Sequence, residues 1–344
     1  MKHIDRQIWQ IALPSIVSNI TVPLLGLIDV AIVGHLGSPA YIGAIAVGGM
    51  LFNIIYWIFG FLRMGTSGMT SQAYGKRDLP EIVRLLMRSV GIGLAVALCL
   101  ILLQVPIRQT AFLIIHPTAE VREMATLYFH ICIWGAPAML GLYGLSGWFI
   151  GMQNSRIPMY IAITQNIVNI IASLSFVCFF KMKVEGVAFG TLIAQYAGFI
   201  MGLVLWMSRY GKLKKYILWK GVLQKEAMMR FFQVNRDIFL RTLCLGTVTL
   251  FFTSAGASQG EIILAVNTLL MQLFTLFSYV MDGFAYAGEA LSGRYIGARN
   301  RKAFTNTTRH LFIWGGWLAA FFTLVYALGG NAFLGLLTDN KDVV

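Results

Sequence analysis

Four charged residues interrupt apolar segments that are long enough to cross a membrane: Asp29, Arg63, Asp282 and Glu289. A charged side chain at the centre of a bilayer costs about 2.5–3.5 kcal/mol even on the lenient insertion scales. Such residues therefore face an aqueous path or pair with one another, and carboxylates in such a path bind and release protons or cations. The pattern predicts ion binding inside the membrane, because a purely structural protein has no reason to keep three buried acids.

Asp29 lies near the outer third of the first apolar segment. Pro14 and Pro23 precede it, and each proline frees a backbone carbonyl and permits a bend. One interpretation is a carboxylate at a helix end that reaches the outer surface. The other is a carboxylate that binds a proton or cation on a helix that bends when its charge changes.

Asn166, Asn169 and Ser173 are spaced i, i+3 and i+7 in the fifth apolar segment, so they share one face of a helix. Amides and hydroxyls on such a stripe hydrogen-bond a neighbouring helix in many membrane proteins. They could equally line the cavity that receives Asp29. Residue types alone leave both interpretations open.

Asp282 and Glu289 are seven residues apart, which places them on one helix face about 10 Å apart along the axis. Glu289 is near the inner end of its segment, so an interfacial position is open to it, whereas Asp282 lies deeper. Arg63 has a corresponding depth in the second segment. We hypothesise that it is the counter-ion of one of the two acids.

The composition predicts an all-α, polytopic helical bundle in a lipid bilayer. The 344 residues are 58% hydrophobic and 12% charged, against about 25% charged in soluble domains. A spanning helix needs about 20 mostly apolar residues. Nine segments satisfy this: 11–33, 42–66, 85–106, 124–150, 158–180, 184–207, 238–256, 261–287 and 311–329.

The distribution of Lys and Arg predicts a cytoplasmic N-terminus. Of the 27 basic residues, 21 fall in the segments on the N-terminal side of the membrane and five on the other. The loop 208–236 is strongly basic and divides a six-helix lobe, 1–207, from a three-helix partial lobe, 237–344. No basic tail with interleaved aromatics occurs, so nucleic acid is not an expected partner.

A weak internal repeat relates the second and eighth segments. Gly75 and Arg77 align with Gly297 and Arg299 at an offset of 222 residues. Both copies approach the membrane from the same side, which predicts parallel repeats about an axis along the membrane normal.

Enzymatic chemistry has little support in this sequence. Ser258 lies in a G-x-S-x-G pattern, but that motif needs a strand-to-helix elbow, and we expect a short outer loop between two spans here. His130 is the one histidine well inside a segment, and no triad partner accompanies it. We therefore expect that the protein is not an enzyme and that it uses no cofactor.

Three stretches resemble the multidrug and toxic compound extrusion (MATE) family, in the branch of DNA-damage-inducible protein F. They are residues 12–29, which contain Pro14 and Asp29, residues 235–241, and residues 281–290. The family's first-helix aspartate falls on Asp29 and its bending proline on Pro14. Its polar pair in the fifth helix falls on Asn169 and Ser173, and many relatives carry an aspartate where Ser173 stands.

The resemblance implies a bacterial inner-membrane antiporter that exports cationic or lipophilic small molecules against an inward flow of H⁺ or Na⁺. With one carboxylate in the first lobe we favour H⁺, while Asp29 and Asn169 are the candidate ligands if the ion is Na⁺. The family has twelve helices, so we expect nine of them here and a longer parent protein. A flippase of lipid-linked oligosaccharides is the alternative within the same superfamily.

Overall fold

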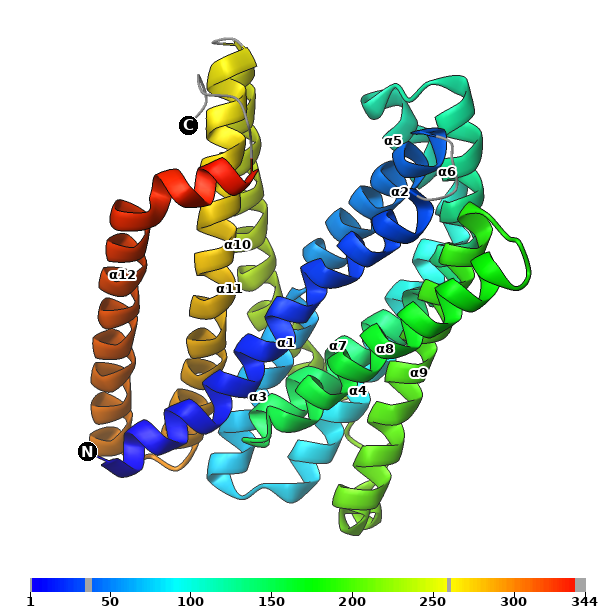
Figure 1. The fold of residues 1–344 in the computed structure, drawn as a ribbon. Helices are drawn as coiled ribbons and strands as arrows, with labels where there is room; N and C mark the ends of the chain where they lie inside the picture. The colour runs from blue at the N-terminus through cyan, green and yellow to red at the C-terminus, as the bar shows by residue number, and fades with distance from the viewer. Residues whose placement is uncertain (1, 35–38, 259–260, 338–344) are drawn as a thin grey trace.

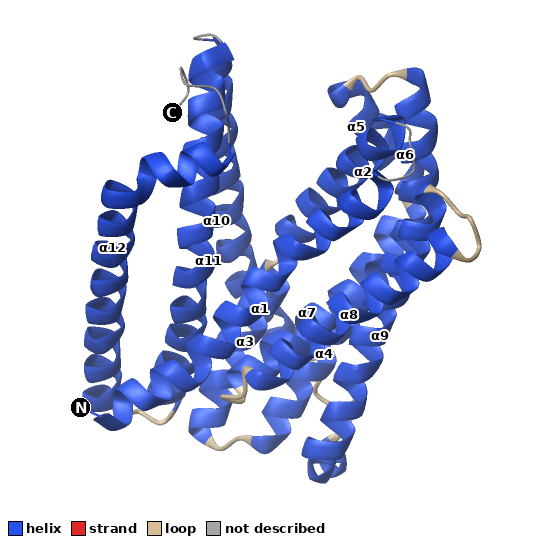
Figure 2. Ribbon diagram, in the orientation of Figure 1, coloured by secondary structure: helices blue, strands red, loops and turns tan. Residues whose placement is uncertain are grey.

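The computed structural model describes residues 2–34, 39–258 and 261–337, and within these ranges it contains helices and short loops but no strand (Figure 2). Nine segments of the described chain are long and apolar enough to cross a membrane, as the sequence predicts. The helices are α1 (Lys2–Gly34), α2 (Pro39–Ile58), α3 (Phe61–Lys76), α4 (Leu79–Leu102), α5 (Gln104–Ile115), α6 (Ala119–Cys132), α7 (Ala136–Gly151), α8 (Arg156–Cys178), α9 (Val184–Tyr210), α10 (Lys225–Ser258), α11 (Glu261–Gly297) and α12 (Arg301–Leu337).

The helices form two groups that meet at one end of the molecule and diverge toward the other (Figure 1). One group contains α10–α12, and the other contains α2–α9, which form five spans and, together with α1, are called the six-helix group. Helix α1 crosses diagonally between them and packs against both α11 and α8. We call the end with the N-terminus the basic end, because it carries the connections after α3, α7, α9 and α11, where the sequence places most Lys and Arg.

Two of the nine spans are broken within the bilayer-crossing segment. The span 39–76 changes from α2 to α3 at Phe59 and Gly60, and the span 119–151 changes from α6 to α7 through a 3₁₀ turn, Ile133–Gly135. Gly60 has little helix propensity, and Pro137 stands in the first turn of α7, where its missing N–H costs no hydrogen bond. Each break therefore follows from the local sequence.

Small residues set the closest helix contacts in the six-helix group. A Cβ atom on Gly147 would lie 2.3 Å from the carbonyl oxygen of Arg63, and one on Gly190 would lie 2.1 Å from Oγ of Ser173. Glycine at these positions lets α7 approach α3 and lets α9 approach α8. Gly147 and Gly151, and likewise Gly186 and Gly190, have G-x-x-x-G spacing, and these pairs act in packing.

The segment 208–236, expected as a linker, is largely helical. Helix α9 continues to Tyr210, a 3₁₀ turn covers Gly211–Tyr216, and α10 begins at Lys225. Helix α10 begins earlier than the predicted span 238–256 because its first turns are partly buried. Phe231 and Asn235, four residues apart on one helix face, are 1% and 2% exposed. The irregular part of the linker is therefore short.

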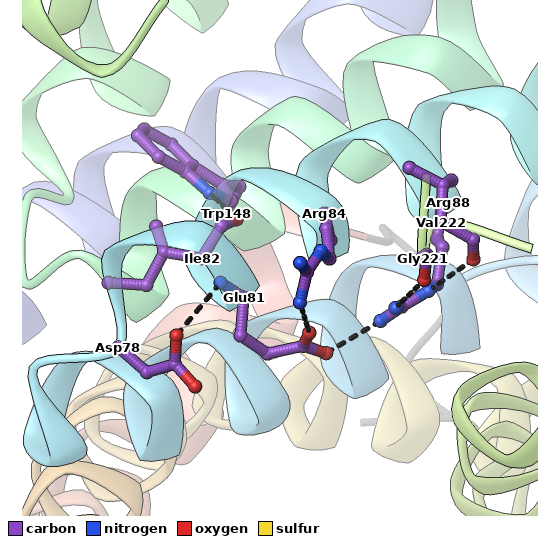
Figure 3. Close-up of polar contacts among 8 residues, drawn as sticks. All are labelled: Asp78, Glu81, Ile82, Arg84, Arg88, Trp148, Gly221 and Val222. Carbon is purple, nitrogen blue, oxygen red and sulfur yellow. Dashed lines mark hydrogen bonds and ion pairs between the residues drawn. The ribbon is translucent and has the colours of Figure 1, made fainter. Parts of the chain in front are cut away.

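Arg88 of α4 holds this short connection against the six-helix group (Figure 3). Its side chain is buried, and it donates to the carbonyl oxygens of Val222 at 2.7 Å and Gly221 at 2.9 Å and to Oε1 of Glu81 at 2.6 Å. Gly221 has φ +95°, a conformation that glycine adopts without strain. These hydrogen bonds thus hold the segment just before α10 against α4 beside Arg88.

Candidate functional site

The first cluster lies where the C-terminal half of α1 packs against α8 and α9. Asp29 is 4% exposed, and its Oδ2 accepts a hydrogen bond of 3.4 Å from Oγ1 of Thr191. Thr191 in turn accepts a hydrogen bond of 3.1 Å from Nδ2 of Asn169, which is fully buried. Three helices therefore contribute a carboxylate, a hydroxyl and an amide to one series of hydrogen bonds. Because Asp29 is buried, the interpretation that it reaches an outer surface is excluded.

Several oxygens in this cluster have no hydrogen-bond partner among the described residues: Oδ1 of Asp29, Oδ1 of Asn169 and Oγ of Ser173. An ionised carboxylate with one long hydrogen bond from a neutral donor is poorly stabilised away from water. A proton or a small cation would compensate the charge of Asp29. The unpaired oxygens of Asp29 and Asn169 are hard ligands of the kind that alkali and alkaline-earth cations accept.

Asn166 and Ser173 have contacts of a different kind. Nδ2 of Asn166 donates to the carbonyl oxygen of Ala162 in its own helix at 3.0 Å. Ser173 is fully buried against Gly190, which favours a role in the contact between α8 and α9. Of the three polar residues on this face of α8, Asn169 is the one connected to Asp29 through hydrogen bonds.

Helix α1 continues through both of its prolines. Pro14 lacks the N–H that would bond the carbonyl of Gln10. The hydroxyl of Ser155, just before α8, approaches that carbonyl at 3.4 Å and donates to the neighbouring carbonyl of Ile11 at 2.9 Å. The sequence-predicted weak point at Pro14 therefore receives a hydrogen bond from another helix.

The second cluster lies where α1, α3, α10 and α11 meet. The guanidinium carbon of Arg63 is 3.9 Å from the centroid of the Tyr286 ring, a cation–π contact. The hydroxyl of Tyr286 donates to Oδ1 of Asn19 at 3.4 Å, and Nδ2 of Asn19 donates to the carbonyl of Tyr279 at 3.2 Å. Arg63 therefore stacks on an aromatic ring that α1 holds in place.

Asp282 and Glu289 flank Tyr286, and both interact electrostatically with Arg63 and Arg241. Arg63 forms no ion pair within 4.0 Å with either acid in the described structure, so our counter-ion hypothesis holds only at longer range. Glu289 is partly buried, while Asp282 is exposed. Two acids and two arginines make this cluster close to neutral.

Comparisons with known proteins decide the family. The MatE family profile matches residues 14–174 and 238–344. DNA damage-inducible protein F of Escherichia coli is 38% identical over 98% of this chain and 74% of its own length. The chain belongs to the MATE transporter family.

Other MATE proteins resemble the chain along nearly its whole length. The multidrug export protein MepA of Staphylococcus aureus is 20% identical over 97% of the chain and 73% of its own length. The bent form of the Vibrio cholerae MATE transporter VcmN superposes with a TM-score of 0.87 at 19% identity, over 99% of this chain and 77% of that one. At that identity the superposition shows the fold.

Two residues of the polar clusters described above were not predicted from the sequence. Thr191 is a single hydroxyl in an apolar helix, and Arg241 lies at the start of the apolar segment 238–256. Neither has a local signal, because each matters only through contacts with α1 or α11. Among the described residues no three His, Cys, Asp or Glu side chains gather as a metal site would require.

Proposed function

We propose that the protein is a secondary antiporter that exports cationic or lipophilic small molecules in exchange for an inward-moving ion, with Asp29 as the coupling carboxylate. The burial of Asp29 beside Thr191 and Asn169 carries this proposal. A carboxylate held in this way is favourable when it is neutralised and costly when it is bare. Access of the ion from one side of the membrane and release to the other would then couple its gradient to export.

The identity of the ion follows from the same cluster. Asp29 is the single carboxylate there, since Ser173 stands where many family members carry an aspartate, and one carboxylate matches the charge of one proton. A sodium ion would need about six oxygen ligands, and the cluster offers few oxygens beyond those of Asp29, Asn169 and Thr191. We therefore favour H⁺ and keep Na⁺ as the alternative that transport assays can separate.

The positively charged residues support export over the flipping of anionic lipid-linked sugars. A flippase for such substrates would need several uncompensated cations in its cavity. Arg63 stacks on Tyr286 and interacts with two carboxylates, so its charge is balanced within the protein. We further propose that the basic end faces the cytoplasm of a bacterial inner membrane, because basic connections are retained on that side.

Efflux of a cationic dye from cells or vesicles with an imposed gradient tests the proposal. Asp29→Asn should abolish efflux driven by a pH gradient, while the exposed Glu123→Gln should leave it unchanged. A sodium gradient applied at constant pH separates the two ions. Undiminished efflux by a correctly folded Asp29→Asn protein would remove Asp29 from the mechanism.

A further inference from the structure

A groove between the two helix groups is not used by either polar cluster. It has a volume of about 830 Å³ and lies between α10 on one side and α4 with the α2–α3 break on the other. Most of its lining is aromatic or aliphatic, including Phe59, Phe61, Ile92, Val96, Phe232 and Phe239. The groove is therefore suited to a hydrocarbon chain.

The charged residues that line the groove are both basic. Lys225 is in the first turn of α10 and is exposed, and Arg236 lies three turns further along. Arg236 pairs with its neighbour Asp237 at 3.1 Å, and Glu226 follows Lys225, but neither carboxylate lines the groove. Lys225 thus gives one end of the groove a positive charge.

The depth of the groove follows from the Arg88 contact. Arg88 holds Val222 against α4, and Lys225 follows Val222 by three residues, so this end of the groove lies beside the first half of α4. Phe239 lies 14 residues after Lys225, which corresponds to a rise of about 21 Å along α10. One leaflet of the hydrocarbon core is about 15 Å thick. The groove is long enough for one acyl chain below a headgroup at Lys225.

We propose that this groove binds one anionic phospholipid from the leaflet at the basic end. Its phosphate lies at Lys225, and an acyl chain lies between α4 and α10. Basic pockets between membrane helices recognise acidic headgroups in this way. Because α4 and α10 belong to different helix groups, the lipid contacts both and joins them at the side of the molecule.

The proposal uses the membrane orientation given above and does not depend on Asp29 or on export. Asp29→Asn should keep the lipid while it loses transport. Loss of the lipid with transport intact, or the reverse, would therefore identify which of the two proposals fails.

Native mass spectrometry of the purified protein in equimolar phosphatidylglycerol and phosphatidylcholine tests the site. We expect one retained phosphatidylglycerol per protein. Lys225→Gln should weaken its retention on the order of fivefold, since one basic side chain near a headgroup contributes about that factor. Lys302→Gln, near the start of α12, is the matched control and should have no effect.

A second pair of variants tests the acyl-chain site by volume. Val96→Trp places a large side chain in the groove, whereas Leu98→Trp adds the same side chain on α4 at an exposed position outside the lining. The first should remove the bound lipid and the second should retain it. Equal retention of the two lipids, or equal loss in Val96→Trp and Leu98→Trp, would overturn the proposal. Retention of a zwitterionic lipid alone, or displacement by the exported dye alone, would also overturn it.

Discussion

Gly75 of α3 and Gly297 of α11, which occupy equivalent positions in the internal repeat, each lie against the backbone of the other's helix. A Cβ atom on Gly75 would be 2.0 Å from the carbonyl oxygen of Arg294, and one on Gly297 would be 2.0 Å from that of Gln72. The two helix groups therefore make backbone contact at the basic end. The two helix groups are in contact at this end, while they diverge at the other end (Figure 1).

Gly75→Ala should force α3 and α11 apart at the basic end. The added methyl group meets backbone, which cannot rotate away, so we expect a loss of about 1–3 kcal/mol in stability. Gly68→Ala on the same helix is the control, because its Cβ would meet nothing within 4 Å. Thermal unfolding in detergent measures both, and an equal midpoint for the two variants would contradict the contact.

Thr191→Val should impair coupling without loss of the fold. The substitution keeps the volume but removes both the donor to Asp29 and the acceptor for Asn169. We expect gradient-driven efflux to fall about tenfold, the effect of losing one hydrogen bond to a charged group. Thr191→Ser retains the hydroxyl and should restore most of the rate. Similar rates for Val and Ser would show that the hydroxyl has no part in coupling.

Arg88→Leu should destabilise the protein by about 3 kcal/mol. It leaves the carbonyl oxygens of Val222, which is buried, and of Gly221, which is partly buried, without their charged donor. Arg84 also approaches Glu81, at 3.6 Å, but it is partly exposed, so Arg84→Gln should cost less than about 1 kcal/mol. The difference between the two unfolding midpoints is the test, and its absence would mean that the connection is held by other contacts.

Asp5→Ala should loosen α12 from the start of α1. Oδ1 of Asp5 accepts hydrogen bonds from Nε1 of Trp314 at 3.0 Å and from Nδ1 of His310 at 2.8 Å. Loss of both acceptors should cost about 1–2 kcal/mol. Asp5→Asn keeps one oxygen acceptor and should cost less. Limited proteolysis near residue 300 reports the loosening, and an unchanged cleavage rate in Asp5→Ala would argue against this anchor.

The elements that the sequence predicts well are those with a local signal. The nine spans follow from apolar length, and the repeat is visible in the turns that end α3 and α11. Arg77 and Arg299 have φ angles of 59° and 55°. The next residues, Asp78 and Asn300, each accept a hydrogen bond from a backbone N–H three residues later and so cap α4 and α12.

The elements that the sequence does not predict depend on partners that are distant along the chain. The sequence predicts a start of this helix near residue 238, because the charged residues between 225 and 236 are typical of a loop. The structure begins α10 at Lys225, because Phe231 and Asn235 are buried against other helices. The connection of Thr191 to Asp29 spans 162 residues. That of Arg88 to Val222 spans 134 residues. Spacing along one helix carries no information about such pairs.

Helix α1 has 33 residues and is therefore about 50 Å long, well beyond the roughly 30 Å of a hydrocarbon core. Its course is diagonal relative to α10 and α11 in Figure 1, and this inclination shortens the distance that α1 covers along the direction of those helices. One of its ends is bound to α11 and α12, and the other carries Asp29 against α8 and α9. Because bilayer thickness biases the tilt of a long helix, a thicker or thinner membrane should change the angle between the two helix groups, and the protein's working state should depend on lipid chain length.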